Sequence, residues 1–223
     1  MSASRQHAQD LRKGASVLPE WVKDAARATL APVVRLAIAL RLTPNTITVI
    51  GLVITIVAAV LVANGQLLVG AAILTAGSLL DAVDGALARA TGGGTPFGGF
   101  LDSTLDRAGE AILYIGIGAW LLAAIDEPAL PMLALMVALA GSFLVSYAHA
   151  RAQGIGFAAN VGLAPRTERL VLVIAGVALA GLGLSLGLIA ALVIVAALTV
   201  ATVVQRILHV WRLSQASSDI KEI

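Results

Sequence analysis

Residues 67–89 read LLVGAAILTAGSLLDAVDGALAR, an apolar run that is broken only near its end by two aspartates and one arginine. A helix needs about 20 predominantly apolar residues to cross the hydrocarbon core of a bilayer. This run is long enough, and its residues do not alternate between apolar and polar. The stretch therefore predicts a transmembrane helix that carries Asp81 and Asp84 close to one of its ends.

The composition of the whole chain indicates a membrane protein. Of its 223 residues, 59% are apolar and 13% are charged, and the mean hydropathy is +0.94. Soluble domains carry about 25% charged residues, so these values exclude a water-soluble globule, a disordered tail and a nucleic-acid-binding protein. The lack of cysteine excludes disulfides and thiolate sites, and three scattered histidines (His7, His149 and His209) do not suggest a histidine-rich metal site.

Six apolar segments are long enough to span the membrane. They comprise residues 46–64, 67–89, 98–125, 129–150, 168–184 and 186–208. Because none of them alternates as the strands of a β-barrel do, we expect helices. The predicted fold is an all-α integral membrane protein with six transmembrane helices.

The basic residues predict how the chain is oriented. In a six-span topology all 15 lysine and arginine residues fall on one side, whereas the connections at 64–66, 126–127 and 181–187 carry none. Positively charged loops stay in the cytoplasm. We therefore expect both termini on the cytoplasmic side of the cell membrane.

The chain divides into three parts. Residues 1–43 are predicted to be a cytoplasmic N-terminus, without a cleavable signal peptide. Its apolar residues recur at helical spacing, typical of an amphipathic helix in the membrane interface or of a helix packed on the bundle. The sequence Leu42-Thr43-Pro44-Asn45 ends this helix. Residues 44–212 form the six-helix transmembrane domain, and residues 213–223 a cytoplasmic tail.

Four aspartates are predicted to meet near the cytoplasmic ends of the second and third spans. Asp81 and Asp84 are three residues apart and Asp102 and Asp106 are four apart, so each pair shares one face of a helix. A charged residue inside a membrane costs about 2.5–3.5 kcal/mol on insertion scales, and four carboxylates repel one another. A hard divalent cation bound by oxygen ligands balances this charge better than the neighbouring arginines alone. Structural ion pairs or a proton path are the alternative.

These aspartates belong to a longer pattern. The segment Asp81-x2-Asp84-Gly85-x2-Ala88-Arg89-x8-Gly98-x3-Asp102-x3-Asp106 resembles, at every fixed position, the signature of the CDP-alcohol phosphatidyltransferases. Residues 146–152 (SYAHARA), 166–169 (RTER) and 204–206 (VQR) are similar to the bacterial phosphatidylinositol phosphate synthases of that family. Neither a P-loop nor a dinucleotide fingerprint is present in the sequence.

The resemblance implies a membrane enzyme of phospholipid biosynthesis, which moves a phosphatidyl group from a CDP-linked lipid such as CDP-diacylglycerol to an alcohol and releases CMP. It also implies a homodimer and Mg²⁺ or Mn²⁺, with two ions on Asp81, Asp84, Asp102 and Asp106. Asp106 is expected to take the proton of the attacking hydroxyl, or to act as a metal ligand alone. The residues expected to bind the CDP-lipid are Asn45, Thr48, Gly85, Ala88, Arg89 and Thr95. Outside this signature, Gly85 and Ala88 would suggest helix packing and Arg89 a snorkelling side chain.

Basic residues near the cytoplasmic ends of the last three spans predict the acceptor. Guanidinium groups bind phosphate with two parallel hydrogen bonds, so a phosphorylated polyol is expected at His149, Arg151, Arg166, Arg169 and Arg206. By resemblance, that polyol is inositol phosphate. His149 stands where the phosphatidylinositol phosphate synthases typically have lysine, which leaves glycerol 3-phosphate as an alternative acceptor. The arginines could also be ordinary positive-inside residues.

A cation-coupled transporter or a channel is the alternative class of function, because such proteins also carry intramembrane carboxylates. The acidic residues lie near one face of the predicted membrane domain and not at its midplane. The sequence also contains no evident inverted repeat. Both observations favour an enzyme.

The metal site gives the first prediction. Asp81→Asn, Asp84→Asn or Asp102→Asn should each abolish CMP release from the CDP-lipid, because a carboxamide has the size of a carboxylate but not the charge that a divalent cation requires. Excess chelator should do the same to the wild-type protein, and added Mg²⁺ or Mn²⁺ should restore its activity. The assay measures CMP released by purified protein, with unchanged gel-filtration behaviour as the control for folding. Full activity in excess chelator would contradict a metal-dependent site.

Overall fold

The computed structural model describes residues 42–90, 95–159, 161–163 and 165–219, together with Arg35, Ala39 and Leu40. Within this part, each of the six predicted spans is a helix. The helices are α3 (Pro44–Ala63), α4 (Leu67–Ala90), α5 (Pro96–Ala124), α6 (Ala129–Gly154), α7 (Arg166–Gly181) and α8 (Ser185–Asp219). The described chain is thus all-helical apart from its connections. The interfacial helix predicted before residue 42 lies, except for those three residues, outside the described part.

Local sequence accounts for where the helices begin and end. The dipeptides Thr43-Pro44 and Thr95-Pro96 start α3 and α5: each threonine hydroxyl accepts a hydrogen bond from a backbone N–H of the first turn, and proline fits the first helical position. Gly65 follows α3 with a φ of 79°, a left-handed conformation that favours glycine. α8 continues past the predicted end of its span at residue 208, because neither proline nor glycine occurs between 208 and 219.

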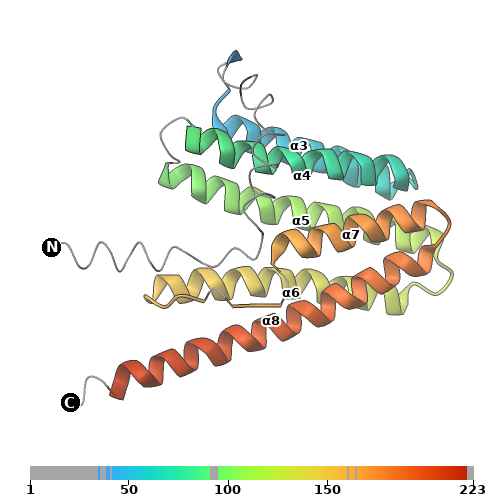
Figure 1. The fold of residues 1–223 in the computed structure, drawn as a ribbon. Coiled ribbons are helices and arrows are strands. Elements are labelled where there is room, and N and C mark those ends of the chain that lie inside the picture. Colours follow the sequence, from blue (N-terminus) through green and yellow to red (C-terminus); the bar gives the residue numbers. More distant parts are fainter. Residues whose placement is uncertain are drawn as a thin grey trace, which may run out of the picture.

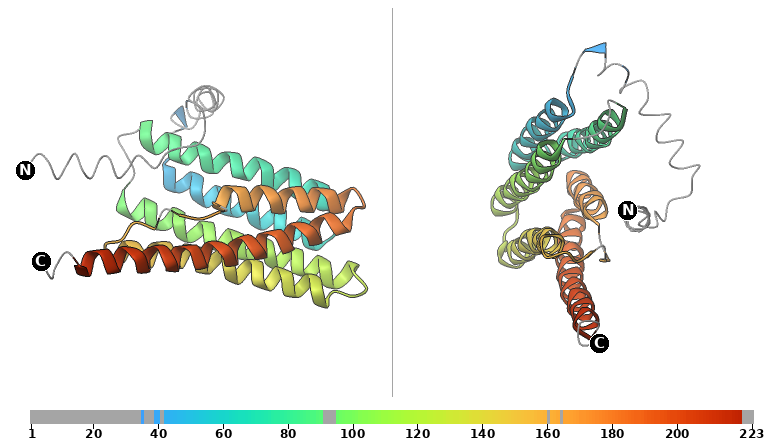
Figure 2. Two further views of the ribbon diagram at one scale, coloured as in Figure 1. Left: turned by 60° about the horizontal axis from the view of Figure 1, so that its bottom comes forward. Right: turned by 90° about the vertical axis from the view of Figure 1, so that its left-hand side faces the viewer.

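The helices form two groups of three (Figure 1). In the first group α3 packs against both α4 and α5, and in the second α8 packs against both α6 and α7. The two groups meet where α4 contacts α7 and where α5 contacts α6 (Figure 2). Successive helices run in opposite directions, so the N-terminal ends of α3, α5 and α7 point the same way as the C-terminal ends of α4, α6 and α8 (Figure 1). We call this end of the bundle the site end.

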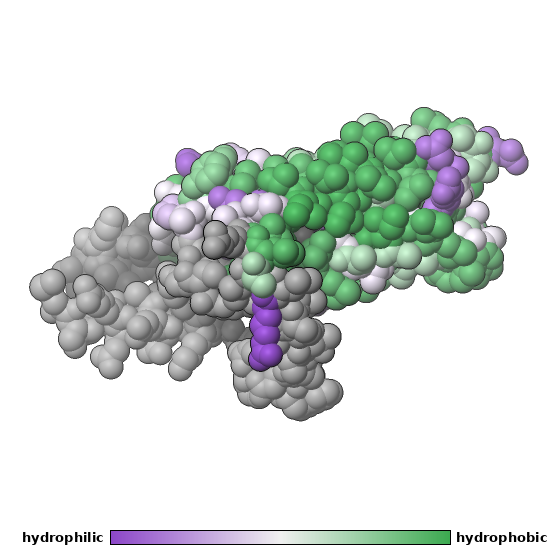
Figure 3. Space-filling model, turned by 90° about the horizontal axis from the view of Figure 1, so that it is seen from above, coloured by the Kyte–Doolittle hydropathy of each residue, from purple (hydrophilic) through white to green (hydrophobic). Residues whose placement is uncertain are grey.

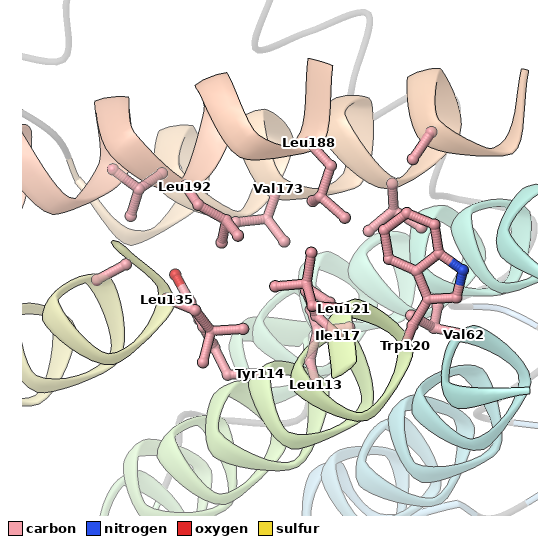
Figure 4. Packing of buried hydrophobic residues seen from close by; sticks show 14 of the residues in the cluster. Val62, Leu113, Tyr114, Ile117, Trp120, Leu121, Leu135, Val173, Leu188 and Leu192 are labelled. Carbon is pink, nitrogen blue, oxygen red and sulfur yellow. The ribbon is translucent and has the colours of Figure 1, made fainter. Parts of the chain in front are cut away.

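Apolar side chains both fill the bundle and cover its surface. Inside, Leu113, Ile117 and Leu121 of α5 face Val173 of α7 and Leu192 of α8 (Figure 4). Outside, apolar residues cover the middle of the face shown in Figure 3, and hydrophilic residues gather toward its ends. In water such a surface would be unstable. The chain is therefore a membrane protein.

Four helices of the described part are long and apolar enough to cross a bilayer: α3, α5, α6 and residues Ser185–Gln215 of α8. The apolar part of α4 comprises Leu67–Leu80. α7 has 16 residues and is the shortest of the six helices in the described part.

Small residues allow close contact between the helices. A Cβ added at Gly116 of α5 would collide with the backbone carbonyl of Ala59 in α3, and one added at Gly141 of α6 would collide with Thr199 of α8. Helices in membranes associate through such close packing, because lipid supplies no hydrophobic driving force between them. Gly116 therefore determines how closely α5 approaches α3.

Replacing Gly116 should weaken this contact. Gly116→Ala should lower the thermal unfolding midpoint of the detergent-solubilised protein, because the new methyl group meets rigid backbone; overpacking of this kind typically costs about 1–3 kcal/mol. Gly154→Ala is the matched control, since nothing lies within 4 Å of a Cβ added there. Equal midpoints for the two variants would show that Gly116 does not limit the approach of α5 to α3.

Candidate active site

The acidic signature belongs to α4 and α5, near their site ends. Asp102 and Asp106 lie one turn apart on α5, and both are half-buried. The backbone of α4 includes Asp81, Asp84, Gly85, Ala88 and Arg89, whose side chains lie outside the described part. α3 packs against both signature helices, and α4 and α5 both line one cavity.

This space, which we call the inner cavity, has a volume of about 40 Å³. Four helices contribute polar residues to its wall: Thr48 and Thr55 from α3, Ser78 from α4, Asp106 and Glu110 from α5, and Arg166 from α7. Leucines and glycines complete the lining. The inner cavity therefore brings polar groups of four helices together within an otherwise apolar bundle.

The predicted metal ligands are a set of carboxylates. Among the side chains that the structure describes, no three His, Cys, Asp or Glu residues gather closely enough to hold a metal ion. Two of the four predicted ligands, Asp81 and Asp84, fall outside those side chains. The four predicted metal ligands are all carboxylates, and they belong to two helices that line the same cavity. Carboxylate oxygens are suitable ligands for a hard divalent cation such as Mg²⁺ or Mn²⁺.

Three of the six residues predicted to bind the CDP-lipid, Asn45, Thr48 and Thr95, lie at the start of α3 and α5. A Cβ added at Gly98 would lie 3.0 Å from Asn45 Oδ1 and 3.2 Å from Thr95 Oγ1, so Asn45 and Thr95 flank the same glycine of the signature. Thr48 is buried, and its hydroxyl donates a hydrogen bond to the carbonyl of Pro44 at 3.0 Å. The structure thus brings Asn45, Thr95 and Gly98 together beside the acidic helices.

A second space lies on the other side of α5, with a volume of about 310 Å³. We call it the arginine pocket. The polar side chains in its lining are Arg107, Ser146, His149, Arg166, Arg169 and Arg206. Four of the five predicted acceptor residues are among them. The fifth, Arg151, is exposed and does not line the pocket.

Two arginines of the pocket pair with carboxylates of α5. Arg166 Nη1 lies 2.8 Å from Asp106 Oδ2, and Arg169 Nη2 lies 3.6 Å from Glu110 Oε1. Arg169 is almost fully buried, with 2% of its side chain exposed. These pairs join α7 to α5 one helical turn apart.

The remaining basic residues are held by hydrogen bonds. Arg206 donates to the carbonyls of Val161, at 2.9 Å, and Val145, which ties α8 to α6 and to the segment before α7. Arg107 donates to the hydroxyl of Ser146 at 3.0 Å. These contacts fix both guanidinium groups at the pocket wall.

His149 is oriented by the backbone of the same segment. Its Nδ1 lies 3.1 Å from the carbonyl oxygen of Ala159. A carbonyl only accepts hydrogen bonds, so Nδ1 carries the hydrogen. The imidazole is thereby held in one orientation at the edge of the arginine pocket.

Two residues of this site were not among the predicted ones. Arg107 is one of the neighbouring arginines that the sequence assigns only to balancing the charge of the aspartates, because its position directly after Asp106 does not reveal which helix it faces. Glu110 continues the four-residue spacing of Asp102 and Asp106 along one helix face, and that spacing is the signal that could have identified it.

Comparison with known families identifies the kind of protein that contains these two spaces. The family model for CDP-alcohol phosphatidyltransferase matches residues 41–214, which include the whole described site. The chain belongs to this family. It is therefore a transferase of phospholipid biosynthesis that passes a phosphatidyl group from a CDP-linked lipid to an alcohol.

Three relatives show which members of the family this chain is similar to. The phosphatidylinositol phosphate synthase of Corynebacterium glutamicum is 37% identical over 183 residues, covering 82% of this chain and 84% of its own. The archaetidylinositol phosphate synthase of Methanothermobacter thermautotrophicus is 40% identical over 167 residues, covering 74% of this chain and 82% of its own. Crystal structures of the Mycobacterium tuberculosis phosphatidylinositol phosphate synthase, one with CDP-DAG and one with manganese and citrate, each match with a TM-score of 0.76 and 32% identity. The matches cover 82% of this chain and 93% and 88% of those chains.

Proposed function

We propose that this phosphatidyltransferase uses inositol phosphate as its acceptor and binds the phosphate in the arginine pocket. The observation that carries the proposal is the position of that pocket: it adjoins Asp106 of the signature through Arg166, which lines both spaces. The similarity to two inositol phosphate-dependent synthases supports the same acceptor.

The charge of the pocket suits a phosphate monoester. Four guanidinium groups line it, and the two carboxylates of Asp106 and Glu110 pair with them, so positive charge is in excess. A phosphate monoester carries a charge of about −1.5 to −2 near pH 7. Planar guanidinium groups in fixed positions recognise it through charge-assisted hydrogen bonds.

The signature residues supply the chemistry of transfer. Asp81, Asp84, Asp102 and Asp106 would hold two Mg²⁺ or Mn²⁺ ions, and a divalent cation bound there supplies charge neutralisation to the phosphates of the donor. Asp106 lies at the border of the two spaces and takes the proton of the acceptor hydroxyl. Asn45, Thr48 and Thr95, with Gly85, Ala88 and Arg89 of α4, bind the CDP-lipid.

We propose that all six helices cross the membrane and that the site end faces the cytoplasm. The basic residues of the described helices lie toward that end, whereas Asp126 and Glu127 occupy the opposite end between α5 and α6. A water-soluble acceptor then reaches the arginine pocket from the cytoplasm. The homodimer implied by the family resemblance stays a prediction.

Glycerol 3-phosphate is the second candidate acceptor. His149 supports it, because the imidazole takes the place of the lysine typical of phosphatidylinositol phosphate synthases and its Nδ1 is already engaged with Ala159. An imidazole offers less positive charge near neutral pH than a lysine does.

The acceptor is tested with purified protein, a CDP-lipid and a panel of inositol phosphate, glycerol 3-phosphate and unphosphorylated inositol. Wild-type protein should release CMP with inositol phosphate. Arg206→Ala should raise the KM for that acceptor about tenfold or more, since each charge-assisted contact contributes about 1.5–3 kcal/mol, and should leave the KM for the CDP-lipid unchanged. His149→Lys should improve the use of inositol phosphate.

Two outcomes contradict this assignment. CMP release with glycerol 3-phosphate and none with inositol phosphate would replace the proposed acceptor by the second candidate. A preference for the unphosphorylated alcohol would mean that the arginine pocket does not bind phosphate.

Topology is tested by labelling single cysteines introduced into this cysteine-free chain. Gly93→Cys and Gln153→Cys should react with an impermeant reagent from the cytoplasmic side only, and Asp126→Cys from the outside only. Labelling of Gly93→Cys and Asp126→Cys from the same side would contradict the six-span topology.

A further inference from the structure

The inner cavity and the arginine pocket share a wall made of two ion pairs. Asp106 and Glu110 of α5 line the inner cavity, Arg169 of α7 lines the arginine pocket, and Arg166 lines both. The pairs Asp106–Arg166 and Glu110–Arg169 cross this wall one helical turn apart. Asp106 belongs to the signature, whereas Glu110 has no role in the transfer described above.

The deeper pair is the more strongly buried of the two. The side chains of Arg169 and Glu110 are 2% and 12% exposed, compared with 32% and 15% for Arg166 and Asp106. The apolar core begins directly beyond Glu110, with Leu113, Tyr114 and Ile117 on the next turns of α5 (Figure 4). Water is scarce at this depth. If either Glu110 or Arg169 lost its partner, water could not replace the lost charge.

A buried ion pair inside a membrane protein contributes little net stability, because removing two charges from water offsets their attraction. Such groups are typically retained for function. The Glu110–Arg169 pair places a guanidinium group at the wall of the arginine pocket, at a depth where an unpaired arginine would turn toward water.

We propose that Glu110 is a positioning residue of the acceptor site. From the side of the inner cavity its carboxylate holds the Arg169 guanidinium against the arginine pocket, where that group contacts the phosphate of the acceptor. This inference rests on the proposed function, because it requires a phosphorylated acceptor in the pocket. Glu110 thus acts on acceptor binding and does not touch the reacting atoms.

The experiment compares Glu110→Gln with Glu168→Gln, a matched control. Glu168 is exposed, precedes Arg169 directly and lines neither space. For each variant, the KM for inositol phosphate, the KM for the CDP-lipid, the Mg²⁺ concentration for half-maximal CMP release and the thermal unfolding midpoint are measured. Glu110→Gln should raise the KM for the acceptor about tenfold or more, as expected for a lost charge-assisted contact. The KM for the CDP-lipid and the Mg²⁺ concentration for half-maximal CMP release should match those of Glu168→Gln.

Two further variants keep a charge at this position. Glu110→Asp, one methylene shorter, should fold and should raise the acceptor KM by less than Glu110→Gln does. The exchange Glu110→Arg with Arg169→Glu restores an ion pair between α5 and α7 but places a carboxylate at the arginine pocket. Its acceptor KM should therefore stay raised even where its thermal midpoint recovers.

Three results would overturn the inference without affecting the proposed function. Recovery of the acceptor KM in the exchange variant would show that the pair serves only to join the helices. A raised Mg²⁺ requirement with an unchanged acceptor KM would make Glu110 a metal ligand. An unchanged acceptor KM in Glu110→Gln, in a wild-type background that uses inositol phosphate, would remove the positioning role and leave the proposed function intact. Failure of the wild-type protein to use any phosphorylated acceptor would instead remove the proposed function itself, and this inference with it.

Discussion

The need to pair charges inside an apolar bundle governs the site of this protein. The helices are apolar on their outer and inner surfaces alike, so each charged group at depth requires a partner from another helix. Asp106 and Glu110 of α5 meet this need with Arg166 and Arg169 of α7. Because these pairs join the two three-helix groups, the position of α7 relative to α5 and the form of both polar spaces depend on them.

The same pairs separate two kinds of chemistry. On one side lies the inner cavity, which is lined by the carboxylates of Asp106 and Glu110. On the other lies a pocket with an excess of guanidinium groups. In the proposed reaction the acceptor hydroxyl meets the donor at the border, beside Asp106. A lipid-bound donor and a water-soluble acceptor can then approach one reaction centre from different environments without competing for the same charges.

The helices and the signature could be predicted from the sequence because both depend on residues that are close together in the chain. The length of an apolar run is set by the thickness of the bilayer, and the Thr-Pro dipeptides at 43–44 and 95–96 start helices by satisfying backbone N–H groups within one turn. All six predicted spans are helices in the described part, and four of them are long and apolar enough to cross a bilayer. The spacing of Asp102, Asp106 and Glu110 also fixes a common helix face without reference to the rest of the fold.

Only the tertiary structure decided which helices are neighbours and which arginines face the site. A membrane helix is apolar all round, so its hydrophobic pattern does not show which side packs against protein, and α3 could not be foreseen between α4 and α5. Arg151 and Arg107 both lie toward the site end of their helices, yet Arg151 is exposed while Arg107 lines the pocket. Sequence by itself determined the helices and the acidic motif, because both depend on contacts within a few residues. The arginine pocket and the Glu110–Arg169 pair depend on contacts between helices far apart in the chain, which only their packing defines.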